Sequence, residues 1–138
     1  MKTIIVATDF SPAAENALKY AVALSVAAKT EMVVHHSLPL SHSTAKSITP
    51  LPNYRKELEN SKQRLLNLTS EIEATYHIKV RAACGTALLL DDLEELTKEY
   101  NEALVVVGMR GDSWERMMFG SMTISILEAA KYPVLVVP

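Results

Sequence analysis

The chain has 138 residues, of which 49% are hydrophobic, and its formal net charge is −2. This length and apolar content predict a single domain, residues 1–138, with a sizeable core. The small negative charge argues against binding to nucleic acid or to an anionic membrane surface. Cys84 is the only cysteine, so no intrachain disulfide can form, and without a signal-peptide pattern we expect a cytoplasmic protein.

The amino-terminal part of the chain alternates between strand and helix signals. Ile4 to Ala7 is a short β-branched run, typical of a strand buried on both faces of a parallel sheet. Ser11 can cap a helix and Pro12 suits its first turn, after which alanine and leucine recur on one stripe as far as Ala28. Glu31 to Ser37 predicts the second strand.

The middle of the chain repeats this alternation after a loop. The segment from Pro39 to Pro52 is rich in Ser, Thr and Pro and lacks an apolar period, which predicts a surface loop. Apolar residues at alternating steps of four and three predict helices from Tyr54 to Ile72 and from Leu89 to Tyr100. Between them, Ile78 to Cys84 alternates in polarity, as expected of an edge strand with one wetter face.

The carboxyl-terminal part adds two strands and a helix. Ala103 to Val107 and Val134 to Val137 are uninterrupted apolar runs, and a helix is expected from about Ser121 to Lys131. Pro133 ends that helix. The resulting β-α-β alternation predicts the α/β class, with an open five-stranded parallel sheet and helices on both faces.

Two loops at the carboxyl ends of strands are the natural place for a ligand in such a fold. The first contains Thr8 to Pro12, and the second runs from Gly108 to Ser121. The second holds Gly108, Gly111 and Gly120, three of the four glycines, next to a helix start whose free amides favour an anion. This predicts a phosphate cradle, although glycines here could also simply turn the chain after a buried strand.

At these loops the chain resembles the universal stress protein family. Asp9 matches an aspartate after the first strand, and Gly108, Gly111, Gly120 and Ser121 match a glycine motif after the fourth. The resemblance implies a strand order of 3-2-1-4-5 and an adenine nucleotide, ATP or AMP, at the switch point between strands one and four. The implied nucleotide-binding residues are Ala7, Thr8, Asp9, Ser37, Val107, Gly108, Arg110, Gly111, Gly120, Ser121, Met122 and Thr123.

The resemblance also implies a small regulatory protein of the stress response that dimerises through the strand Val134 to Val137. Magnesium is an optional companion of the nucleotide, and no tightly held metal is expected. No positioned base or metal-binding carboxylate pair lies in either loop, so no catalytic residue is assigned. Weak ATP hydrolysis, or self-phosphorylation at Ser121 or a nearby hydroxyl, stays open by resemblance.

One departure from the family pattern keeps a second function open. Gly111 and Gly120 are separated by eight residues, one fewer than in the ATP-binding members. Asp112 and Glu115 would also oppose a triphosphate. The alternative is a dimeric interaction module of the same fold that binds no nucleotide. Asp9 likewise has an alternative role as the cap of the first helix.

Two other groups of polar residues are expected to be structural. His35 and His36 are adjacent on a strand and point to opposite faces, which favours hydrogen-bonded histidines over a shared metal. The acids Asp91 and Asp92, with those that follow on the same helix, are expected to form its solvated face.

Overall fold

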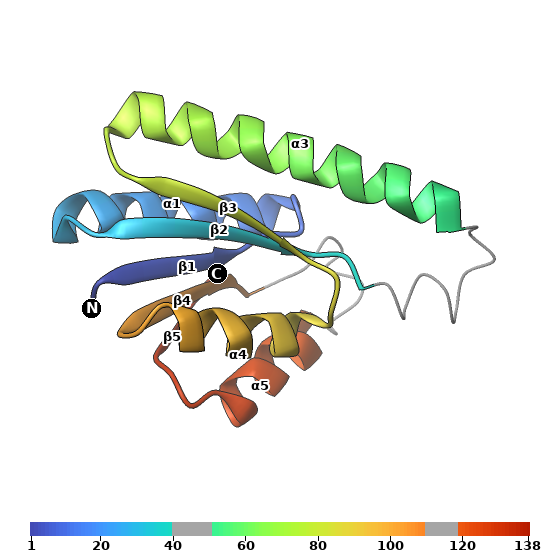
Figure 1. Ribbon diagram of the computed structural model, residues 1–138. Coiled ribbons are helices and arrows are strands. Elements are labelled where there is room, and N and C mark those ends of the chain that lie inside the picture. The colour runs from blue at the N-terminus through green and yellow to red at the C-terminus, as the bar shows by residue number, and fades with distance from the viewer. Residues whose placement is uncertain (40–50, 110–118) are drawn as a thin grey trace.

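A five-stranded parallel sheet forms the centre of the molecule (Figure 1). The computed structural model describes residues 1–39, 51–109 and 119–138. The strands are β1 (Thr3–Ala7), β2 (Glu31–Ser37), β3 (Val80–Gly85), β4 (Ala103–Gly108) and β5 (Val134–Val137). Their order is β3-β2-β1-β4-β5, as predicted, so the connections change direction between β1 and β4.

Helices cover both faces of this sheet. On one face lie α1 (Pro12–Ala28) and α3 (Leu51–Tyr76), and on the other α4 (Leu89–Glu99) and α5 (Phe119–Ala129) (Figure 1). Strand β1 divides its side chains between two apolar layers, since Ile4 and Val6 face α1 and α3 while Ile5 and Ala7 face α4 and α5. Within the described ranges, no helix is both long and apolar enough to cross a membrane.

Helix α1 packs closely on the sheet because its buried stripe is made mainly of small residues. Ala14, Ala17 and Ala21 are all at most 5% exposed. Ser11 caps the helix, accepting a hydrogen bond from the Ala14 N–H at 3.2 Å. Lys29 ends it in the left-handed conformation, with φ of 55°. The amino terminus of α1 is thereby fixed beside the carboxyl ends of β1 and β4.

Three elements begin at a clearly different residue from the one predicted from the sequence. Strand β3 begins at Val80, because His77 ends α3 in the left-handed conformation and Ile78 packs on the core before the ladder starts. Helix α3 begins at Leu51, inside the stretch expected to be a loop; residues 40–50 of that stretch lie outside the described residues. Helix α5 begins at Phe119, since a first helical turn accommodates Gly120, and it ends at Ala129 ahead of Pro133.

Candidate functional site

A cavity of about 310 Å³ opens at the carboxyl ends of β1, β2 and β4. The amino-terminal residues of α4 and the side of α5 complete its wall. Eight of the twelve predicted site residues line it: Ala7, Thr8, Asp9, Ser37, Val107, Gly108, Met122 and Thr123. Residues from four separate elements therefore meet where the sequence analysis expected a ligand.

The remaining four predicted residues belong to the segment between β4 and α5. Arg110 and Gly111 lie outside the described residues. Gly120 and Ser121 form part of the first turn of α5. The backbone N–H groups of a first helical turn have no partner within the helix, so this end of α5 can attract an anion.

The turn between β1 and α1 is held by its own side chains. The Phe10 N–H donates to Thr8 Oγ1 at 3.0 Å, and the Ser11 N–H donates to Asp9 Oδ1 at 2.9 Å. The helix cap is therefore Ser11, and Asp9 instead orients the capping residue. Phe10 adopts a left-handed conformation with φ of 63°, which is costly for an aromatic residue and is sustained by the surrounding hydrogen bonds.

Gly108 lies where the first turn of α1 leaves little space for a side chain. A Cβ atom at this position would lie 3.0 Å from the Ala13 carbonyl oxygen, in the first turn of α1. The carbonyl of Gly108 accepts a hydrogen bond from Thr123 Oγ1 at 3.3 Å. The glycine thus lets β4, α1 and α5 converge at the floor of the cavity.

The main chain of Ser37 is directed toward the open end of β1. The Thr8 N–H donates to the His35 carbonyl at 2.8 Å, whereas the Leu38 N–H donates to Gly85 on the opposite side at 2.9 Å. Successive peptide groups of a strand alternate in direction, so the N–H and C=O of Ser37 face the same side as those of His35. Because β1 pairs with β2 only as far as His35, this donor and acceptor lie beyond the ladder.

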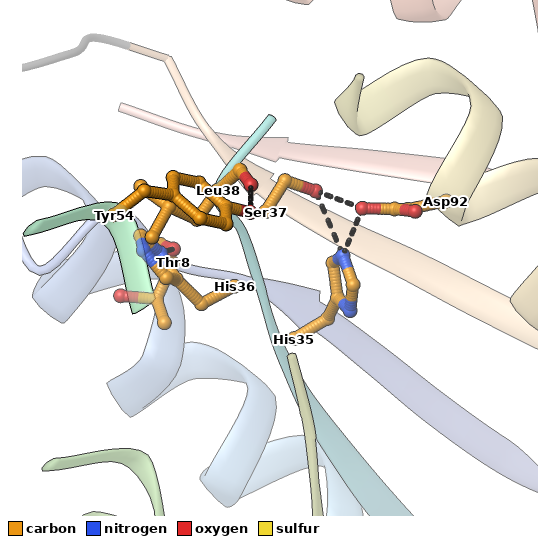
Figure 2. Close-up of polar contacts among 7 residues, drawn as sticks. All are labelled: Thr8, His35, His36, Ser37, Leu38, Tyr54 and Asp92. Carbon is orange, nitrogen blue, oxygen red and sulfur yellow. Dashed lines mark hydrogen bonds and ion pairs between the residues drawn. The ribbon is translucent and has the colours of Figure 1, made fainter. Parts of the chain in front are cut away.

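A buried polar cluster joins β2 to α4 beside the cavity (Figure 2). Ser37 Oγ donates to Asp92 Oδ2 at 2.6 Å, and His35 Nε2 lies 2.8 Å from Ser37 Oγ and 3.2 Å from Asp92 Oδ2. The side chains of His35 and Asp92 are 3% and 13% exposed. Asp92 does not belong to the solvated face of its helix, and that expectation was wrong.

Two features of the sequence are compatible with this cluster in hindsight. His35 and Ser37 are two residues apart on a strand, so they share a face. Gly85, paired with Ser37, leaves room for the Asp92 carboxylate, which would overlap a Cβ atom at position 85. A polar pair on a buried strand face requires partners, and an acid in the first turn of the following helix can supply one.

The electrostatics of the cluster follow from its burial. Loss of solvent around His35 lowers the pKa of its imidazole below the ordinary value of 6.5, and the nearby Asp92 carboxylate only partly opposes this. The ring is therefore neutral at pH 7. Its Nδ1 is buried and makes no hydrogen bond of accepted geometry among the described residues, although the Ala83 carbonyl acts on the ring as a weak backbone partner. Because Nε2 lies 3.2 Å from a carboxylate oxygen, we assign the single proton of the neutral ring to Nε2.

His36 points to the other face of the sheet, as predicted. Its Nδ1 lies 2.8 Å from the Thr8 carbonyl oxygen, and its ring centroid is 4.8 Å from that of Phe10. The guanidinium of Arg64, on α3, covers the Phe10 ring at 4.1 Å. These contacts stabilise the turn between β1 and α1 on the face of the sheet that α3 covers. Among the described residues no three metal-ligating side chains gather into a site.

Comparisons with known proteins agree with this architecture. The family model of the universal stress protein family matches residues 1–138. The universal stress protein MJ0577 of Methanocaldococcus jannaschii is 23% identical over 153 aligned residues, covering 99% of this chain and 94% of that protein.

Solved structures show the same fold. UspA from Lactobacillus plantarum superposes with a TM-score of 0.81 at 17% identity, covering 99% of this chain and 97% of the other. A universal stress protein from Archaeoglobus fulgidus in complex with dAMP gives a TM-score of 0.73 at 21% identity, covering 100% and 98%. The chain belongs to the universal stress protein family.

Proposed function

We propose that the protein binds an adenine nucleotide, ATP or AMP, in the cavity between β1 and β4, as a small regulatory protein of the stress response in the cytoplasm. The observation that carries this proposal is the meeting of eight expected site residues around one cavity of about 310 Å³. Membership of the family and the dAMP complex of the Archaeoglobus fulgidus relative support it.

The base would lie against the end of β2. The N–H and C=O of Ser37 offer one donor and one acceptor side by side, which is the pattern that complements the Watson–Crick edge of adenine. Val107, Leu88 and Leu89 supply apolar walls for the ring faces. The base would thus be recognised largely by main-chain groups.

The phosphates would lie at the amino terminus of α5. Gly120 and Ser121 occupy its first turn, where free N–H groups and the helix dipole stabilise negative charge. Gly108 leaves the floor of the cavity without a side chain at this position. Arg110 and Gly111 enter the proposal through the sequence motif alone. A magnesium ion bound with ATP would be coordinated mainly by phosphate oxygens and water.

Calorimetric titration with ATP, ADP and AMP tests the proposal directly. Gly120→Val should abolish binding, because a branched side chain would block the approach of phosphate to the first turn of α5. Ala129→Val, at the exposed far end of the same helix, is the matched control and should bind as the wild type does. Absence of heat and of thermal stabilisation at millimolar nucleotide would contradict the proposed function.

Exposed apolar side chains near the cavity favour the second candidate, a dimeric interaction module. Leu88 and Met122 line the cavity yet are 51% and 44% exposed, and Ile124 and Leu127 on α5 are 53% and 50% exposed. Exposed apolar side chains that lie together often mark contact surfaces, and Leu88 and Met122 lie together at the cavity. Stoichiometric adenine nucleotide released from freshly purified protein, detected by mass spectrometry, would argue against this candidate.

Both candidates include a homodimer through β5. This strand is at one edge of the sheet, and three of its four residues, all apolar, are only partly buried. An apolar edge strand can pair with a second copy and remove the exposed surface. Sedimentation equilibrium should give a dimer mass, and a monomer at high concentration would exclude this assembly.

A further inference from the structure

The hydroxyl proton of Ser37 is engaged in a hydrogen bond within the protein itself. Ser37 Oγ lies 2.6 Å from Asp92 Oδ2, a short charge-assisted hydrogen bond in which only the hydroxyl can donate (Figure 2). Ser37 is also part of the cavity wall. A ligand that reaches this hydroxyl therefore finds its proton directed away, toward α4.

His35 does not offer the Ser37 hydroxyl a second acceptor in place of Asp92. The protonated Nε2 of the neutral ring lies 2.8 Å from Ser37 Oγ, so it donates to the same oxygen. Ser37 Oγ thus donates one hydrogen bond and accepts another, which leaves one lone pair. The oxygen can only accept a further hydrogen bond.

The packing of α4 holds Asp92 in the position where it accepts the Ser37 hydroxyl proton. Asp92 occupies the space over Gly85, where any side chain would overlap its carboxylate. The next residue, Leu93, is fully buried in the core between α4 and the sheet. With the helix anchored in this way, movement of the Asp92 carboxylate away from Ser37 would leave the buried His35 and the partly buried Ser37 without their shared acceptor.

We infer that Ser37 Oγ, kept as an obligate acceptor by Asp92 and His35, selects the base by favouring the exocyclic amino group of adenine over the carbonyl oxygen of hypoxanthine or guanine. The inference rests on the proposed function, since it concerns the base in that cavity. An amino group donates to the remaining lone pair. A carbonyl oxygen at the same place meets another acceptor, which costs free energy without any compensating bond.

The test compares the affinities of ATP and inosine triphosphate by calorimetry. Main-chain groups of Ser37 contribute to discrimination in every variant, so the informative quantity is the change in the ratio of the two dissociation constants. Ser37→Ala should reduce the preference for ATP by about 3- to 10-fold, the effect of one hydrogen bond. Ser37→Thr, which keeps the hydroxyl, should retain the preference.

Asp92→Asn provides an independent arm. The amide can donate to Ser37 Oγ, which releases the hydroxyl proton toward the cavity and should tighten binding of inosine triphosphate. Asp91→Asn, an exposed change in the same helical turn, is the matched control and should leave the ratio unchanged. Circular dichroism and thermal melts of each variant establish that the compared proteins are folded.

The outcomes separate this inference from the proposed function. If the wild type binds neither nucleotide, the proposed function fails. If the wild type binds ATP and Ser37→Ala keeps the wild-type ratio, the proposed function stands and the role of Ser37 Oγ is refuted. A loss of preference in Ser37→Ala that Ser37→Thr restores supports the inference.

Discussion

The two faces of the sheet differ in the kinds of side chain that lie between the strands and the helices. The layer under α1 and α3 is filled mainly by aliphatic side chains, among them the buried Leu65 and Ile72. The layer under α4 and α5 is also apolar at its centre but ends in a cavity and in the His35–Ser37–Asp92 cluster. One face therefore contributes chiefly burial, whereas the other combines burial with polar groups of fixed orientation.

Truncating a buried side chain in the layer under α1 and α3 should produce the largest loss of stability. Leu65 is 1% exposed, and Leu65→Ala removes buried methyl groups and leaves a cavity, at a cost of about 2–5 kcal/mol in the free energy of unfolding. Urea denaturation measures this value. Nucleotide affinity of the folded variant should remain that of the wild type, and a parallel loss of affinity would show that the two faces are coupled.

Breaking the polar cluster on the second face should cost less. Asp92→Ala leaves Ser37 and His35 without their shared acceptor, and an unsatisfied buried polar group costs about 1–3 kcal/mol. Asp91→Ala, one residue away and exposed, should change stability by at most about 0.5 kcal/mol. Equal losses in the two variants would mean that Asp92 contributes only as a helix residue.

Low pH should reduce the free energy of unfolding by protonating His35, which lies in the layer under α4 and α5. The folded-state pKa of His35 is lowered by burial, so the unfolded chain binds its proton at higher pH than the native protein does. The free energy of unfolding should therefore fall as pH drops through 6.5 toward the folded pKa, with a slope of at most about 1.4 kcal/mol per pH unit from this group.

The control for this pH dependence is His35→Gln, which removes the titrating ring while keeping an amide able to contact Ser37. Urea denaturation at several pH values between about 5 and about 8 gives the free energy of unfolding of the wild type and of the variant as a function of pH. An unchanged slope in the variant would assign the acid sensitivity to another group.

The smallest effect is expected from a single hydrogen bond on the first face. Tyr54 Oη donates to the Leu38 carbonyl at 2.6 Å, and Tyr54→Phe removes this bond while keeping the ring. The expected loss is about 0.5–1.5 kcal/mol by urea denaturation. Tyr76→Phe, at the exposed far end of α3, serves as a control and should have no measurable effect.

The fold was predictable because its signals are local. Uninterrupted β-branched runs identified β1, β4 and β5, and helical periodicity identified α1 and α4. The strand order came from the family resemblance. The amino-terminal extent of α3 was not predictable, because a Pro-containing start after a Ser- and Thr-rich segment carries a loop signal.

The site was predictable in part for the same reason. Gly108 ends β4 and Asp9 lies two residues beyond the end of β1, and because these parallel strands are neighbours the topology brings the two residues together. Asp92 was missed because it was read as one of a run of acids on a solvated helix face. Helical spacing separates it from Asp91, since Asp92 lies three residues after Leu89 and four before Leu96, on the stripe that faces the sheet. Its partners on β2 could not be predicted, because they are long-range contacts.

The length of α3 has a consequence for the protein surface beside the terminus of β2. Its 26 residues extend about 39 Å, whereas the seven residues of β2 extend about 23 Å, and the amino-terminal turns of the helix project past the carboxyl ends of the strands (Figure 1). Tyr54 connects this overhang to the residue after Ser37. The turns of α3 that carry the exposed Asn53, Arg55 and Lys56 are therefore attached to the terminus of β2, next to a residue of the cavity wall.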